Sequence, residues 1–253
     1  MKIAVLIKQV PGSDSSLPIQ SDESWINEES ITYVMNESDN YALEEALQLR
    51  EKNGDGEGVV ISLGPDRVQK VIREGLAKGA DRGIHIQVDS AGAVDPLVTA
   101  SSIANAIKEE KFDLIFSGLQ SDDIGMGQTG IILGEILGMS TASLVMATEL
   151  SENRIKVKRE LEAGFFQWVT MTLPSSVTIQ SGLNTPRYPS LKGIMGAKKK
   201  EINVLTPGGS DPKQSMNKVY VPQSEKQTVM IDGSVDEIVD KLIETFRNDI
   251  KVI

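Results

Sequence analysis

The sequence predicts an α/β protein of three layers, in which helices cover both faces of a mostly parallel, doubly wound sheet. Before residue 140, short apolar runs alternate repeatedly with amphipathic segments, which is typical of parallel strands joined by crossover helices. The runs lack the alternation of half-exposed strands, so we expect them to be buried on both faces. The expected strands are residues 3–7, 59–63, 84–88 and 113–117.

Capping residues mark the helices between these strands. Asp39 is the expected N-cap of the first helix, and Asp95 followed by Pro96 predicts the start of the third. A fourth helix is expected to begin near Gln128. Glycines, which end helices readily, follow three of these segments at Gly54, Gly79 and Gly138.

The pattern changes after residue 140. Several strand-like runs follow with no helix between them, and residues 167–173 alternate polar and apolar side chains as a half-exposed antiparallel strand does. We expect an antiparallel extension that completes a mixed sheet. The expected strands are residues 144–149, 155–161, 166–173 and 177–180.

The end of the chain is expected to be an arm. Residues 206–233 are rich in Pro, Gly, Ser, Lys and Gln, and they cannot bury enough apolar surface to fold alone. An amphipathic helix follows, with Ser234 as its expected N-cap. We therefore divide the chain into a nucleotide-binding α/β domain of residues 1–200 and a C-terminal arm of residues 201–253. The arm would pack on this domain or on a partner chain.

The composition argues against several functions. The chain has no cysteine and a single histidine, His85, so we expect no disulfide, thiolate metal site, cysteine nucleophile or Ser-His-Asp triad. The formal net charge of −10 argues against a nucleic-acid binder. Apolar runs all fall short of the roughly 20 residues that a membrane span needs, so we expect a cytoplasmic protein without membrane insertion.

The most informative loop, residues 118–130, lies between the fourth expected strand and the fourth helix. Ligands of parallel sheets bind outside the carboxyl ends of the strands, and a helix N-terminus favours a phosphate. Gln128 and Thr129 add side-chain donors, so the loop is a candidate anion site. Residues 125–130 match the G-x-G-x-x-G dinucleotide motif, but that motif belongs directly after the first strand, and we reject it. The alternative is that the glycines only shape the loop.

Two neighbouring carboxylates in the same loop, Asp122 and Asp123, are a candidate magnesium site. Adjacent residues rarely point at one metal ion, and we find no further carboxylates at a convincing spacing. We therefore favour a solvated pair that shapes the loop, and we predict no metal site.

A second informative stretch covers residues 157–200, and its part from residue 183 to 200 combines two prolines, apolar residues and a lysine run. Apolar side chains rimmed by positive charge on an acidic protein predict a docking surface for a partner. The alternative for the lysines is an ordinary solvated face. The residues expected to dock are Leu191, Ile194, Met195, Lys198, Lys199 and Lys200.

The order of these motifs closely resembles the beta (small) subunit of electron transfer flavoproteins. Shorter matches at Lys8-Gln9-Val10 and Ser62-Leu63-Gly64-Pro65 extend the resemblance over nearly the whole chain. The chain departs from the family in Glu162-Ala163-Gly164, where Asp-Gly-Gly is common, and in lacking the acidic run and the asparagine before Gln128. The main matching motifs are Lys158-Arg159-Glu160 before Gly164, Leu173-Pro174, Leu183-Asn184, Pro186-Arg187-Tyr188, Leu191, Ile194-Met195, Lys198-Lys199-Lys200 and Gln128-Thr129-Gly130.

The resemblance implies an adenine-nucleotide alpha-hydrolase-like fold and an electron carrier without catalysis of its own. The chain would form a heterodimer with an alpha subunit, which holds most of a shared FAD. This FAD would accept electrons from a flavoprotein dehydrogenase, such as an acyl-CoA dehydrogenase, and pass them on. Leu191 matches the leucine that enters a pocket on the dehydrogenase, and the nearby lysines would steer it. The chain would itself bind a structural AMP through Leu6, Asn36, Leu63, Asp123, Gln128, Thr129 and Gly130.

Three other interpretations stay open. Bifurcating relatives bind a second FAD in place of AMP and carry A-Q-V-G where this chain has Gln128-Thr129-Gly130, so Thr129 favours AMP. A stand-alone adenine-nucleotide-binding regulator could share the fold. An NAD-dependent dehydrogenase would need an acid–base group, whereas His85 lies in an expected strand and is predicted to be a core or edge residue.

Overall fold

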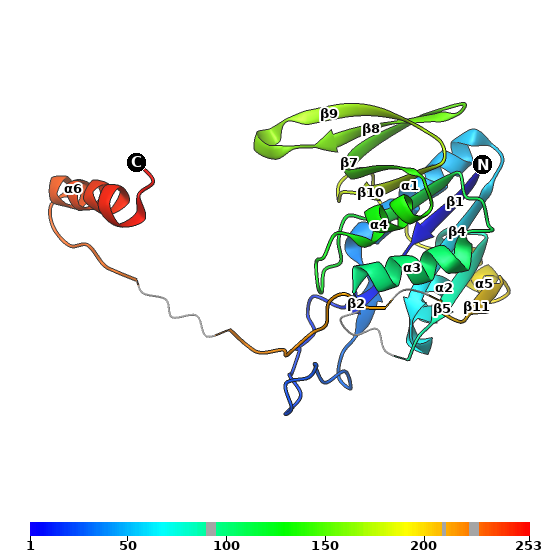
Figure 1. Cartoon of the computed structure of the whole chain (residues 1–253), viewed down its shortest axis with the longest axis horizontal. Coiled ribbons are helices and arrows are strands. Elements are labelled where there is room, and N and C mark those ends of the chain that lie inside the picture. The colour runs from blue at the N-terminus through cyan, green and yellow to red at the C-terminus, as the bar shows by residue number, and fades with distance from the viewer. Residues whose placement is uncertain (90–94, 209–210, 223–227) are drawn as a thin grey trace. The chain divides into compact units, whose positions relative to one another are not determined.

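The computed structural model describes residues 1–89, 95–208, 211–222 and 228–253, which fall into two compact units, Met1–Val219 and Tyr220–Ile253. The first unit contains a nine-stranded sheet in the order β11-β5-β4-β1-β6-β10-β7-β8-β9 (Figure 1). The strands from β11 to β7 are parallel, β8 is antiparallel to β7, and β9 is antiparallel to β8. The predicted three-layer fold with an antiparallel extension is confirmed.

The strands of this sheet are β1 (Lys2–Leu6), β4 (Glu57–Gly64), β5 (Arg82–Gln87), β6 (Leu114–Gly118), β7 (Ser140–Ser151), β8 (Arg154–Glu160), β9 (Phe166–Thr172), β10 (Ser175–Ile179) and β11 (Ile202–Leu205). A separate antiparallel pair is formed by β2 (Gln9–Pro11) and β3 (Tyr33–Met35). The helices are α1 (Glu37–Asn53), α2 (Gln69–Lys78), α3 (Pro96–Ile107), α4 (Thr129–Ile136), α5 (Leu191–Ala197) and α6 (Val235–Thr245). Shorter helical turns are η1 (Asp66–Val68), η2 (Glu162–Gly164) and η3 (Phe246–Ile250).

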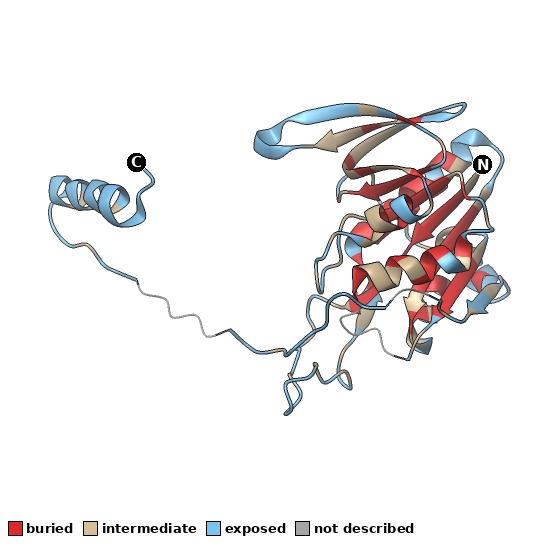
Figure 2. Cartoon of the chain, viewed as in Figure 1, coloured by how far each residue is buried: buried red, intermediate tan, exposed pale blue. Residues whose placement is uncertain are grey.

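Alternate side chains of the central strands supply two separate cores. In β1, Ile3 and Val5 pack with α1 and α2 on one face, whereas Ala4 and Leu6 pack with α3 and α4 on the other. This period of two is what a strand buried on both faces requires. Burial is concentrated in the central strands and in the helix faces that cover them (Figure 2).

The glycine caps expected after the first two helices are present, and Asp95 caps α3 by accepting a hydrogen bond from Leu97 N at 2.8 Å. The expectation for α1 is wrong. Its N-cap is Asn36, and Asp39 lies within the first turn, because the carboxylate of Asp122 reaches the helix from the loop after β6 and accepts from Glu37 N at 3.0 Å. A distant residue therefore replaces the local cap.

The sheet also corrects two expectations for the C-terminal half. Strand β10 lies between β6 and β7 and is parallel to both, so it belongs to the parallel part and not to the antiparallel extension. Residues 201–219 lie in the first unit, since β11 pairs with β5. The expected loop of residues 183–200 contains the short helix α5.

The second unit consists of residues 220–253, of which 223–227 lie outside the described residues. Ser234 caps α6 as predicted, and it does so in a capping box, because Glu237 bonds back to the backbone N–H of Ser234 at 2.8 Å. Asp236 and Glu237 also place negative charge at the positive end of the helix.

Close packing of α4 on the sheet predicts the effect of a single methyl group. A Cβ at Gly134 would lie 2.5 Å from Thr141 Cγ2 and 2.7 Å from Ser176 Cβ, whereas one at Gly196, in α5, meets nothing within 4 Å. We expect Gly134→Ala to lower the free energy of unfolding by ~1–3 kcal/mol through overpacking. Gly196→Ala should leave it unchanged or raise it by up to ~1 kcal/mol. Urea unfolding of the two variants checks this, and equal stabilities would contradict it.

Candidate functional site

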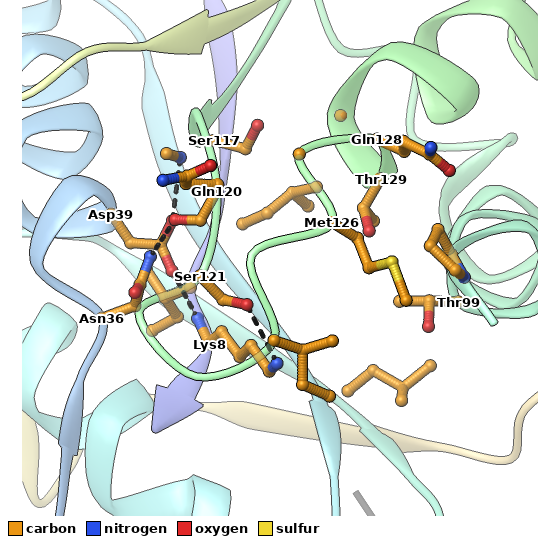
Figure 3. A pocket seen from close by; sticks show the side chains of 18 of the residues that line it. Lys8, Asn36, Asp39, Thr99, Ser117, Gln120, Ser121, Met126, Gln128 and Thr129 are labelled. Atoms are coloured by element: carbon orange, nitrogen blue, oxygen red, sulfur yellow. Dashed lines mark hydrogen bonds between the residues drawn. The ribbon is translucent and has the colours of Figure 1, made fainter. Parts of the chain in front are cut away.

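A pocket opens at the carboxyl ends of β1, β4 and β6, where the strand order reverses direction, as is usual for ligand sites in such sheets. Figure 3 shows Asn36 and Asp39 on one side of it and Thr99, Met126, Gln128 and Thr129 on the other. Its empty space is about 1030 Å³, including the part open to solvent. Its apolar wall includes Leu6, Ile61, Leu63, Val68 and Ile103.

One buried carboxylate joins the two central strands at this edge. Asp39 accepts hydrogen bonds from Lys8 N at 2.7 Å, just after β1, and from Gly118 N at 2.8 Å, at the end of β6. Burial raises the pKa of Asp39 to about 7, although both backbone donors favour its charged form. Only glycine fits at residue 118, because a Cβ there would lie 2.1 Å from Ser38 Oγ and 2.5 Å from Asp39 Oδ1.

The loop after β6 is tied to the start of α1. Asn36 Nδ2 donates to Gln120 O at 3.0 Å, and Asn36 Oδ1 accepts from Asp122 N at 2.9 Å. Ser38 Oγ donates to the same Gln120 carbonyl at 2.8 Å. The side chain of Asn36 thus provides hydrogen-bond partners for two backbone groups of the loop, and these bonds hold the loop beside the pocket.

The two neighbouring aspartates of the loop face different partners. Asp122 caps α1, whereas Asp123 accepts from Lys8 Nζ at 2.7 Å, and the same ammonium donates to Ser121 Oγ at 3.2 Å. Burial opposes ionisation of Asp123, but the Lys8 charge and the hydrogen bonds from Lys8, Ser121 and Ile124 N together outweigh it and hold the pKa of this carboxyl below its ordinary value of 3.8. Among the described residues, no group of three His, Cys, Asp or Glu could hold a metal ion. The contacts of Asp122 with Glu37 N and of Asp123 with Lys8 tie the loop to the start of α1 and to the end of β1.

The first turn of α4 faces the pocket. Gln128 occupies the N-cap position without a side-chain cap bond, and Gln128, Thr129 and Gly130 line the pocket. Backbone N–H groups at a helix start have no partner within the helix, so they are available to an anion. A Cβ at Gly130 would lie 2.4 Å from Ser117 Oγ and 2.8 Å from Thr178 Cγ2, and the glycine therefore lets the helix start approach β6 and β10 closely.

Six of the seven nucleotide-site residues expected from the sequence line this pocket. They are Leu6, Asn36, Leu63, Gln128, Thr129 and Gly130. Asp123 lies beside the pocket and acts through Lys8. Four further residues line the pocket without having been expected from the sequence: Lys8, Asp39, and Thr99 and Ile103 from α3. The spacing of Thr99 and Ile103, four residues apart in a helix that follows a central strand, was the available signal.

The stretch expected to dock a partner is anchored at both ends and exposed between them. Ser190 Oγ caps α5 by accepting from Gly193 N at 3.0 Å. Leu191 and Met195 are 83% and 72% exposed, and Ile194 is 44% exposed. These three apolar side chains all belong to α5.

The three lysines after α5 differ in their exposure to solvent. Lys198 and Lys199 are exposed, whereas Lys200 is half-buried and donates to Leu76 O at 3.1 Å and to Ala80 O. Burial lowers the pKa of Lys200. The structure thus gives Lys200 a role in capping the end of α2 and does not bring it together with the other two lysines.

His85 is fully buried, as predicted, and its Nε2 lies 2.9 Å from Gly64 O. It is not among the residues that line the pocket. None of the helices in the described residues is long and apolar enough to cross a membrane.

The fold and site together define an α/β protein whose pocket ends on the N-terminus of a helix. Residues 24–208 match the family model of the electron transfer flavoprotein domain. The beta subunit of the electron transfer flavoprotein of Methylophilus methylotrophus is 36% identical, over 96% of this chain and 97% of the relative. Those of Syntrophomonas wolfei and Homo sapiens are 33% and 32% identical, over 100% and 98% of this chain and 98% of each relative.

The chain therefore belongs to the family of electron transfer flavoprotein beta subunits. Membership of this family gives it a role in electron transfer, as one subunit of a flavoprotein whose other subunit is an alpha chain.

The buried carboxyl of Asp39 predicts a pH dependence of stability. Its pKa in the folded chain, about 7, lies above its ordinary value of 3.8, so the folded state binds this proton more tightly than the unfolded state does. The contribution of Asp39 to stability is therefore fully present only below its ordinary pKa of 3.8, and it is lost as the pH rises through about 7. Relative to Asp39→Asn, which does not titrate, the unmodified chain should lose ~2–3 kcal/mol between pH 5 and 7.5.

Urea unfolding of both proteins at several pH values measures this difference. A constant difference between the two proteins from pH 5 to 7.5 would show that Asp39 stays ionised, with its charge held by Lys8 N and Gly118 N.

Proposed function

We propose that this chain is a non-catalytic, AMP-binding subunit that shares an FAD with an alpha subunit and docks the dehydrogenase that supplies electrons. The observation that carries the AMP proposal is the combination of an apolar wall and a helix start in one pocket. A purine base suits the apolar wall beside Leu6, Ile61 and Leu63, and a phosphate suits the first turn of α4.

The charges around the pocket favour a monophosphate over a larger nucleotide. The cation that lines it, Lys8, is already paired with Asp123, and Asp39 adds a buried carboxyl. The helix start is thus the main positive feature offered to a ligand. A second FAD, with its diphosphate, would bring two charged groups to a pocket that offers one anion site.

Nucleotide content tests the choice of ligand. The native chain purified without its partner should release AMP and no flavin on denaturation. Thr129→Glu places a carboxylate at the helix start, where it repels a phosphate, so AMP affinity should fall roughly tenfold or more. Thr129→Ser keeps the hydroxyl and is the matched control. Calorimetric titration of nucleotide-free protein with AMP measures both variants.

Two results would overturn this assignment. Released FAD would favour the bifurcating type, and failure of the nucleotide-free chain to bind AMP would reject an AMP site. A stable monomer that binds AMP but never pairs with an alpha chain in gel filtration would favour a stand-alone regulator.

The docking role rests on the exposure of α5. Leu191, Ile194 and Met195 present apolar surface that is rimmed by Lys198 and Lys199, and such a surface suits an acidic rim around an apolar pocket on the donor. We propose that the donor is a flavoprotein dehydrogenase such as an acyl-CoA dehydrogenase. The amphipathic helix α6 is proposed to pack on the alpha subunit, and the absence of cysteine suits a cytoplasmic location.

Truncating the docking leucine should separate docking from folding. In the heterodimer, Leu191→Ala should lower the rate of electron acceptance from the dehydrogenase roughly tenfold, because an anchor residue of an interface contributes more than ~1 kcal/mol. Flavin content and unfolding temperature should stay unchanged, since the side chain is 83% exposed. Leu17→Ala, at a leucine that is also exposed, is the control. Equal transfer rates for both variants would remove Leu191 from the docking site.

A further inference from the structure

The segment before α5 is fastened to α1 along its length. Asn184 Nδ2 donates to Tyr41 O and to Glu45 Oε2, both at 3.1 Å. Three residues later, Arg187 makes a denser set of contacts to the same helix. These contacts lie outside the nucleotide pocket, and the proposed function does not use them.

Arg187 is held in two carboxylate forks. Its Nε and Nη2 donate to the two oxygens of Glu44 at 2.8 and 3.0 Å, and its Nη1 and Nη2 donate to the two oxygens of Glu51 at 2.6 and 3.0 Å. The backbone N–H of Arg187 also donates to Glu44 Oε2 at 3.1 Å. The side chain of Glu44 is only 5% exposed, so this half of the cluster is shielded from water. Arginine alone has the planar donors for such paired forks.

Ionisation of the cluster agrees with this geometry. Burial opposes the charge on Glu44, but hydrogen bonds from Arg187 and Gln48 outweigh it and lower the pKa of this carboxyl below its ordinary value of 4.5. The hydrogen bonds from Arg187 likewise lower the pKa of Glu51. All three groups are therefore charged at neutral pH, and the forks are intact.

The other end of α5 is fastened to α2. Arg73 Nη1 donates to Ala197 O and to Lys200 O, both at 2.6 Å. A helix of seven residues has too few internal hydrogen bonds to be stable alone, so its conformation depends on packing against α2, where Ala197 joins the core, and on these two anchors. Between the anchors, Leu191 and Met195 project from the surface.

We propose that Arg187, through its paired hydrogen bonds to Glu44 and Glu51, is a positioning residue that holds α5 in its docking conformation before the partner binds. The proposal rests on the proposed docking role of Leu191. Ordering a segment before binding removes an entropic cost from association. The contacts of Arg187 with Glu44 and Glu51 should therefore increase the affinity for the dehydrogenase. The flow of electrons within the assembled complex does not involve Arg187.

The test is steady-state electron transfer to the intact FAD-containing heterodimer from a reduced acyl-CoA dehydrogenase, with the heterodimer as the varied substrate. Arg187→Gln should raise the KM for the heterodimer roughly tenfold while kcat and flavin content stay within about twofold. Glu51→Gln, which removes the outer fork from a half-exposed carboxylate, should raise KM roughly two- to threefold without threatening the fold. Arg187→Lys keeps the charge but not the forks, so it should rescue only part of the loss.

Arg82 provides a matched control. It is also an arginine between two glutamates, with Nε 2.8 Å from Glu57 and Nη2 2.7 Å from Glu110, at the start of β5. Arg82→Gln should lower the unfolding temperature but leave KM unchanged. Hydrogen exchange should increase in residues 183–197 for Arg187→Gln and not for Arg82→Gln.

The outcomes separate the two proposals. If Leu191→Ala leaves electron acceptance unchanged, the docking role itself is wrong. If Leu191→Ala impairs it but Arg187→Gln and Glu51→Gln leave KM unchanged, Arg187 has only a structural role and the present inference is wrong. Should Arg187→Gln fail to assemble, Glu51→Gln still decides, because an unchanged KM for that variant also overturns the inference.

Discussion

The pocket depends on the way Asp39 joins the ends of β1 and β6. Its two carboxylate oxygens accept from the backbone N–H groups of Lys8 and Gly118, which would otherwise be buried without partners where these strands end. This contact requires glycine at residue 118 and brings α1 close to the loop after β6. The other contacts between α1 and the loop, through Asn36, Ser38 and Asp122, follow from this approach.

Helix α1 serves two sites on the molecule. Its first turn fixes the loop beside the pocket through Asn36 and Asp39, and its later turns fasten the segment before α5 through Glu44, Glu45 and Glu51. Four of these five side chains carry a carboxyl group, and three of the four, Asp39, Glu44 and Glu45, are buried. The charges are balanced by backbone donors and by arginine, so the helix satisfies most of its acidic groups without water.

The sequence was sufficient for the fold class and for most elements of the sheet, because buried strands and glycine-ended helices leave local patterns. It was also sufficient to locate the helix start at Gln128. It was insufficient where partners lie far apart in the chain. The cap of α1 comes from Asp122, more than eighty residues after the helix begins, and no local motif encodes that contact. The position of β10 is similarly non-local, since its apolar run suits an antiparallel strand and a parallel one equally well. The hydrogen bond from Lys200 to Leu76 O could not be predicted either, because the three lysines of the run are identical in sequence.

The insertion of β10 between β6 and β7 also affects how the chain can fold during synthesis. By the time β6 has been made, β5, β4, β1 and β6 can pair in a continuous half-sheet. Strand β7 then has no inner neighbour until β10 is made, although β8 and β9 can already pair with its outer edge. Strands β7, β8 and β9 therefore have an unpaired edge at β7 until β10 is made. Strand β10 must then pair with β6 on one side and with β7 on the other. Until β10 pairs with β6 and β7, the unpaired edges of these two strands can pair with a second copy of the chain. We expect this step, which joins distant segments, to be the one most prone to mispairing.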